Sequence, residues 1–216
     1  MHLYKLGLLS VFPNQDMKTI DERSTVPLTN YLLLNLLPLR GVYLIKSSAI
    51  ATAWGKCMLF DADIYRQNQW HKQVKNKLQE DTEIMKLLKG QSHNGEVLLA
   101  NRMVSSRDYK NYRDAINGLS KNLLPAFNYN IFALLIYILL IVGGPMVILT
   151  TLNLNLIFFM IGLIILTRTM ISFSTGQQAA YNIILHPLQM INLVIIAFLS
   201  IQRHLTKNVV WKGRRV

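Results

Sequence analysis

The sequence predicts a partial α/β domain followed by an α-helical transmembrane region. The first observation is the distribution of charge over the 216 residues, which carry a formal net charge of +12. All 11 acidic residues lie between Asp16 and Asp114, and only six charged side chains, all basic, follow Lys121. A hydrophobic content of 51% excludes a disordered chain, and a lone Cys57 excludes a disulfide-stapled module. The chain therefore divides into a polar half and an apolar half.

The second observation is the alternation of short apolar runs with polar helical segments in residues 1–125. Gly7–Pro13, Lys56–Phe60 and Glu96–Ala100 have the length and composition of strands. His71–Gly90 and Asp108–Leu124 have helical spacing of their apolar residues, and Gly90 is a candidate C-cap. Alternating strands and helices indicate an α/β fold. Three strands are fewer than a covered α/β sheet usually has, so we expect this half to be part of a domain.

The third observation is three apolar stretches in residues 126–202. Ile131–Leu152 has about 22 residues without a charge, enough to cross a bilayer as a helix. Leu152–Leu166 is shorter and is followed by Arg168, whose side chain we expect to snorkel to the interface. The third stretch, Tyr181–Ile201, is more polar in its first part. These stretches predict two to three transmembrane helices.

The orientation of these helices is open. Residues 203–216 form a basic tail, which the positive-inside rule places in the cytoplasm, and the polar half is also basic. Three crossings would place these two regions on opposite sides, whereas two or four would place them on the same side. Tyr31–Leu39 is too short to span and predicts a buried or interfacial helix. Because basic residues are spread through the first half and gathered beside the apolar stretches, we expect contact with anionic lipid rather than nucleic acid.

Two acidic pairs are candidates for chemistry. Asp61 and Asp63 follow an apolar run and could hold a divalent metal, or could be two solvated acids in a loop. Glu80 and Asp81 could supply a general base, although from composition alone an ordinary helix surface is the favoured interpretation. The five His residues have no metal-ligand spacing, and no Gly-rich phosphate loop occurs. From the residues alone, then, no metal site is assigned.

The order of several segments resembles the membrane branch of the family-two inverting glycosyltransferases, which includes carotenoid and hopene-associated enzymes. The segments that carry this resemblance are SVFPNQ (10–15), ER-x-x-VPL (22–28), LLPL (36–39), GKCMLFDADIY (55–65), EDTEIMKLLK (80–89), SSRDYKNYRDAINGLSKN (105–122), HPL (186–188) and WKGR (211–214).

The resemblance implies a domain of the glycosyltransferase A type that transfers a sugar from a nucleotide-sugar to an acceptor, often a lipid. Glu80 and Asp81 match the family's Glu-Asp motif, in which the Asp is the general base. Arg107 and Lys121 fall in segments that related enzymes place near the diphosphate. Mg²⁺ or Mn²⁺ is expected in the complete family enzyme. Asp61 and Asp63 do not align with its metal motif.

By this resemblance the family's first, nucleotide-binding half is absent, since Met1 falls where that half should end, so we expect the chain to bind a nucleotide-sugar and to be active only if the donor half is supplied. We expect a multi-pass protein of the cell membrane, with the globular half in the cytoplasm and lipids as partners. A non-catalytic basic anchor or scaffold is the alternative. A small transporter is disfavoured because the apolar stretches contain almost no ionisable groups.

Overall fold

The computed structural model describes residues 5–75, 77, 79–206, 210–211 and 214–215. The chain divides into two compact units. Unit 1 contains the residues up to Asn14 together with Leu32–Ser106, and unit 2 contains Gln15–Tyr31 and the chain from Arg107 to Arg215. Each unit is described by itself.

Unit 1 is built on a three-stranded sheet in which β1 (Leu6–Phe12) lies between β3 (Met58–Phe60) and β4 (Asn94–Leu99). β1 pairs with β4 in parallel and with β3 antiparallel. The three apolar runs therefore form strands as predicted, within about two residues of the expected bounds. Two-residue strands, β2 (Asn14–Gln15) and β5 (Ser105–Ser106), lie at the border of the units, where Asn14 N–H donates to the Val104 carbonyl.

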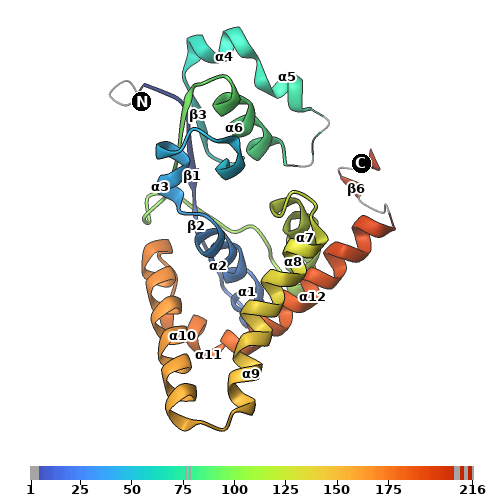
Figure 1. Ribbon diagram of the computed structural model, residues 1–216. Coiled ribbons are helices and arrows are strands. Elements are labelled where there is room, and N and C mark those ends of the chain that lie inside the picture. The colour runs from blue at the N-terminus through green and yellow to red at the C-terminus, as the bar shows by residue number, and fades with distance from the viewer. Residues whose placement is uncertain (1–4, 76, 78, 207–209, 212–213, 216) are drawn as a thin grey trace. The chain divides into compact units, whose positions relative to one another are not determined.

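Short helices surround this sheet (Figure 1). They are α3 (Leu39–Leu44), the 3₁₀ turn η2 (Ser48–Ile50), α4 (Ala62–Asn68), α5 (Trp70–Val74) and α6 (Glu80–Gly90). The core contains Leu8 of β1 with Trp70, Ile84, Met85 and Leu88 of the helices, all fully buried. Burial of these large apolar side chains against one sheet is the main source of stability expected for a unit of this size.

The prediction of a single helix over His71–Gly90 is wrong. Two helices, α5 and α6, occupy the segment, and Gln79 between them has the non-helical dihedrals φ −109° and ψ 67°. Acidic residues then begin α6, where they favour a new helix N-terminus because they complement the helix dipole. Leu78, one of the apolar residues of the predicted helix, lies outside the described residues.

The expected short helix at Tyr31–Leu39 is divided between two elements. α2 (Pro27–Leu36) begins with a proline, and α3 begins after Pro38. Prolines lack the N–H that a helix interior needs, so both positions are suited to helix starts. The border between the two units falls within α2.

Unit 2 is helical. Its elements are α1 (Ile20–Thr25), α7 (Tyr112–Ala126), α8 (Ile131–Ile138), the π-helical turn η3 (Leu139–Gly143), α9 (Gly144–Thr150), α10 (Leu154–Thr175), α11 (Ala179–Ile184) and α12 (His186–Leu205), with two-residue strands β6 (Val210–Trp211) and β7 (Arg214–Arg215). α12 packs on α7 and on α1. α9 and α10 run antiparallel and are joined by a short turn (Figure 1).

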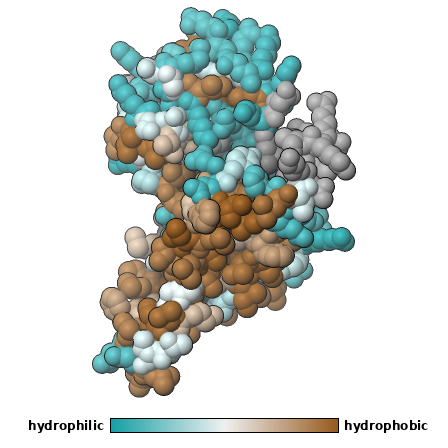
Figure 2. Space-filling view, turned by 45° about the vertical axis from the view of Figure 1, so that its right-hand side comes forward, coloured by the Kyte–Doolittle hydropathy of each residue, from teal (hydrophilic) through white to brown (hydrophobic). Residues whose placement is uncertain are grey.

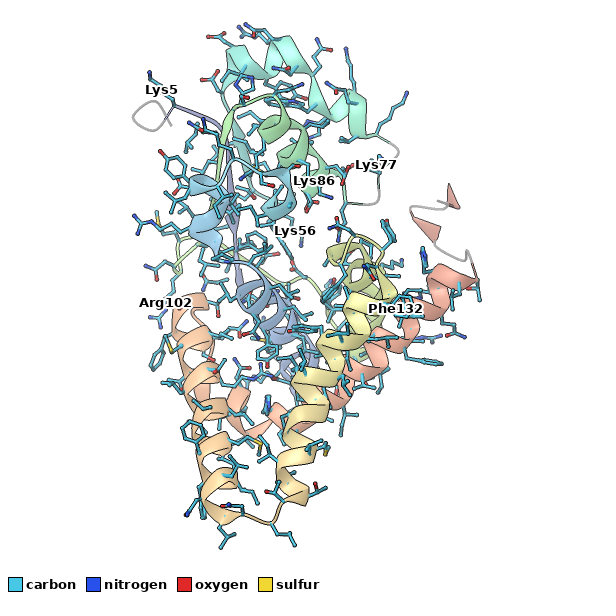
Figure 3. All side chains as sticks on the ribbon, viewed as in Figure 1. Lys5, Lys56, Lys77, Lys86, Arg102 and Phe132 are labelled. Atoms are coloured by element: carbon cyan, nitrogen blue, oxygen red, sulfur yellow. The ribbon has the colours of Figure 1, made fainter. Side chains whose placement is uncertain are left out.

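Within the described part of the chain, three helical segments are long and apolar enough to cross a membrane, Ile131–Thr150, Leu154–Thr175 and His186–Leu205. The visible face of these helices is covered by hydrophobic side chains (Figure 2), and Phe132 on α8 is 79% exposed (Figure 3). Exposed apolar surface of this extent is typical of lipid-facing helices. The chain is therefore a candidate membrane protein, as the sequence predicted.

The bounds of these segments differ from the predicted ones. The second extends to Thr175 rather than Leu166, and the third stretch is broken at Leu185 into α11 and α12. Two polar side chains of its first part, Asn182 and Gln189, are buried and donate hydrogen bonds within the protein. Asn182 donates to Ser172 and Gln177, and Gln189 donates to the Arg23 carbonyl. Satisfying polar groups internally is the requirement at membrane depth.

Candidate functional site

The residues predicted to form a site fall in different units. Unit 1 contains Asp61, Asp63, Glu80 and Asp81, and unit 2 contains Arg107 and Lys121.

Asp81 lies in the first turn of α6, whose position is set by the core of unit 1. Ile84, Met85 and Leu88 are fully buried on one face of the helix. A Cβ at Gly95 of β4 would overlap the Met85 sulfur, so a glycine is needed there for α6 to approach the sheet. The helix start is therefore held rigidly against the strands, which is how a functional side chain is positioned well.

The carboxylate of Asp81 is held by two backbone N–H groups. Asp81 Oδ2 accepts from Gly55 N–H at 2.9 Å, and Oδ1 accepts from Thr82 N–H at 2.8 Å. A Cβ at Gly55 would lie 3.3 Å from Oδ2, a tight contact that glycine avoids. The loop that carries Gly55 is itself fixed to β1, because Trp54 N–H donates to the buried Ser10 Oγ at 2.7 Å.

The surroundings of Asp81 change its acidity. Burial raises the pKa of Asp81 above its ordinary value, although the hydrogen bonds from Thr82 and Gly55 act in the opposite direction. Its neighbour Glu80 is exposed. Three basic residues of the same unit, Lys56, Lys77 and Lys86, are labelled in Figure 3, and Lys56 directly follows Gly55 in the sequence. Asp81 is thus a half-buried, oriented carboxylate whose raised pKa suits a general base better than that of an exposed Asp.

Asp61 and Asp63 have local structural roles. Asp61 caps α4, because its Oδ1 accepts from the N–H groups of Asp63 and Ile64 at 3.1 Å each. The Asp63 carboxylate lies 3.5 Å from Arg66 in an exposed pair one helical turn away. Within the described residues there is no group of three side chains suited to a metal ion. Asp61 is engaged as a helix cap and Asp63 in an exposed ion pair, and we assign no step to a metal.

Arg107 lies against a buried carboxylate. Its Nη2 donates to Glu22 Oε1 at 2.6 Å, and Glu22 also accepts from Lys18 N–H and the Thr19 hydroxyl. Burial alone would raise the pKa of Glu22, but the hydrogen bonds, that from Arg107 above all, hold this pKa below its usual value. Glu22 was missed as a site residue. Thr19 and Glu22 form the T-x-x-E pattern of a capping box, which is the signal that could have identified it.

Lys121 lies half-buried on α7, in a segment that two other residues fix. Arg203 of α12 donates to the Asn117 carbonyl, to its side chain and to Ser120 Oγ. A Cβ at Gly118 would overlap the ring of Tyr109. Burial raises the pKa of Tyr109 to about 12, so its phenol stays protonated at neutral pH. The GLSKN segment is therefore a rigid part of unit 2.

Arg168, whose side chain we expected to snorkel to the interface, is buried among protein side chains. Its side chain is 2% exposed, with Nε donating to His186 Nδ1 at 2.9 Å and the guanidinium stacked 3.9 Å from the Tyr31 ring centroid. Its partners are distant in sequence, and for this reason the apolar pattern around Arg168 did not reveal them. The signal available was the presence of a lone charge within an apolar stretch.

Neither a scan against protein-family models nor searches among curated proteins and solved structures found a match to this chain.

Proposed function

We propose that the chain carries the acceptor-side catalytic base and the membrane anchor of a glycosyltransferase, which transfers a sugar from a nucleotide-sugar to a lipid acceptor. The observation that carries this proposal is Asp81, a half-buried carboxylate with a raised pKa, held by Gly55 N–H at the start of α6. Its place in the ordered motifs that resemble family-two glycosyltransferases supports the assignment, and the three apolar helices support a lipid acceptor.

In the proposed reaction Asp81 accepts the proton of the acceptor hydroxyl. The hydroxyl oxygen attacks the anomeric carbon, the bond from that carbon to the diphosphate breaks, and the nucleoside diphosphate leaves with inversion. Arg107 and Lys121 belong to the other unit, and the resemblance alone proposes them for the diphosphate charge, since cationic donors stabilise a departing diphosphate. We further propose a multi-pass protein of the cell membrane with the globular half, residues 1–125, in the cytoplasm.

The raised pKa gives a pH dependence. Asp81 accepts a proton only when it is ionised, so transfer should fall as the pH drops through its pKa. This acidic limb should lie above the value of about 3.8 that is usual for an Asp. A rate profile whose acidic limb coincides with that of an exposed Asp would contradict this role for Asp81.

The experiment that tests the function is deletion of the gene in the source organism, followed by analysis of its glycolipids. Under the proposal one glycolipid disappears and its unglycosylated acceptor accumulates, and the wild-type gene restores it. The matched variants are Asp81→Asn, which should fail to restore it, and Glu83→Gln on the same helix, which should succeed. Restoration by Asp81→Asn would instead favour a non-catalytic anchor or scaffold.

A failure to fold does not explain the expected loss. Asn at position 81 keeps one oxygen, which can accept from either the Gly55 or the Thr82 N–H group, and it loses the other acceptor. The same change removes a charge that burial disfavours, which offsets part of that loss. We therefore expect Asp81→Asn to accumulate in the membrane at the wild-type level, which an immunoblot of the membrane fraction checks.

A further inference from the structure

A cavity in unit 2 contains a buried positive charge. The cavity has a volume of about 140 Å³ and is lined by Tyr31, Met160, Leu163, Ile164, Thr167, Arg168 and His186. This is several times the space that one water molecule needs. The lining includes one permanently charged side chain and no acid.

The guanidinium of Arg168 is only partly satisfied by the protein. Nε donates to His186 Nδ1, and the Tyr31 ring covers one face of the group. Nη2 is buried and has no hydrogen-bond partner among the described residues. A buried charge without its full set of partners is costly, and a guanidinium matches the two oxygens of a phosphate or carboxylate.

No acid of the chain follows Asp114, so the apolar half cannot itself supply a counter-anion close in sequence. His186 cannot act as the counter-anion of Arg168. Its Nδ1 accepts a hydrogen bond from Arg168 Nε, but an imidazole carries no negative charge. The chemistry of the cavity therefore favours an external anionic oxygen group.

The walls of the cavity indicate where this anion comes from. Met160, Leu163 and Ile164 precede Arg168 on one face of α10 and form an apolar wall, with Leu163 itself 47% exposed. Between Leu156 and Leu166 the helix has no polar side chain, whereas from Thr167 onward hydroxyl groups recur. Arg168 thus lies where the helix changes from apolar to polar side chains, and we take this change to mark the region where lipid chains give way to head groups.

We propose that Arg168 and its cavity bind the anionic head group of a membrane lipid, with the lipid chain along Met160, Leu163 and Ile164. This site does not depend on the proposed sugar transfer. The recognised chemistry is a phosphate or carboxylate oxygen on Arg168 Nη2. Free phosphate in solution shares that chemistry, and the experiment separates the two sources.

The test uses the full chain in phosphatidylcholine vesicles that contain a trace of phosphatidic acid with a spin label in its chain. Electron paramagnetic resonance measures the fraction of label that the protein restricts, and spin-labelled phosphatidylcholine is the reference. One charge-assisted hydrogen bond predicts a preference for phosphatidic acid of about tenfold. Arg168→Gln should reduce this preference to near one, and Arg168→Lys should retain part of it.

A second pair of variants keeps the test decisive if Arg168→Gln does not fold. Leu163→Trp fills the cavity and should reduce restriction of phosphatidic acid, whereas Leu166→Trp, on the same helix but outside the cavity, should not. Equal restriction of the two labelled lipids by the wild type would overturn the proposal. Equal effects of the two Trp variants would overturn it as well. Displacement of the labelled lipid by excess inorganic phosphate would show a free-anion site and overturn the assignment to lipid.

Discussion

The pair formed by Glu22 and Arg107 provides the sharpest test of the energetics of unit 2. The Glu22 side chain is fully buried and that of Arg107 is 31% exposed, with 2.6 Å between Oε1 and Nη2. Replacement by Gln keeps the shape and one oxygen acceptor, but removes the charge and the second of the two oxygens that accept from Arg107 and Lys18. Breaking a fully buried pair costs about 3–5 kcal/mol, and the partial exposure of Arg107 reduces this, so we expect Glu22→Gln to lower the free energy of unfolding by about 2 kcal/mol.

The matched control is Glu83→Gln. Glu83 forms a pair of similar length, 2.8 Å, with Lys86, but both side chains are about one third exposed. We expect this change to cost at most about 0.5 kcal/mol, because exposed pairs contribute little. Denaturant unfolding in mild detergent, followed by helical circular dichroism, measures both. Equal costs for the two substitutions would refute the argument that burial makes the Glu22 pair strong.

The same pair gives a pH dependence. The pKa of Glu22 is lower in the folded protein than its usual value of about 4.5, so its contribution is complete above that pH. This stabilising contribution of Glu22 is lost as the pH falls through its lowered pKa in the folded state, because the wild-type carboxyl then becomes uncharged, like the amide of Gln. The stability difference between wild type and Glu22→Gln should therefore shrink below pH 4.5. A difference that stays constant down to pH 2 would contradict a charge-based contribution.

Two further predictions concern local packing and capping. Gly118→Ala should destabilise by about 1–3 kcal/mol because its Cβ overlaps the Tyr109 ring, whereas Gly162→Ala, with open space around its Cβ, should be neutral or stabilising in thermal unfolding. Asp61→Ala should cost about 1 kcal/mol through loss of the α4 cap, and Asp63→Ala should change denaturant stability by less than half as much. A larger effect at Asp63 than at Asp61 would point to a role beyond local structure.

The strands could be predicted because their signal is local. Short apolar runs such as Leu6–Phe12 are confined to a few residues, and all three formed strands. The parallel pairing of β1 with β4 could not be predicted, because it joins segments more than 80 residues apart. The break between α5 and α6 was also missed. The helical spacing of apolar residues continues through it, whereas the backbone at Gln79 is not helical.

The candidate site was predicted less completely. The role of Asp81 as a base is an expectation from the resemblance alone, and nothing in the sequence showed that Gly55 N–H would hold its carboxylate. The burial of Arg168 was not foreseen, because Tyr31 and His186, the side chains that cover it, come from distant parts of the chain. Long-range contacts of this kind decide whether a lone charge faces water, lipid or protein, and residue spacing does not contain them.

The central claim is that Asp81 is the base of a sugar transfer, and turnover in native membranes tests it most directly. Membranes from the deletion strain that carry wild type, Asp81→Asn or Glu83→Gln are incubated with a labelled nucleotide-sugar, and label in extracted lipid is measured over time. We predict wild-type rates for Glu83→Gln and a loss of about 10²–10⁴-fold for Asp81→Asn at equal amounts of protein. Transfer by Asp81→Asn at the wild-type rate would contradict the claim.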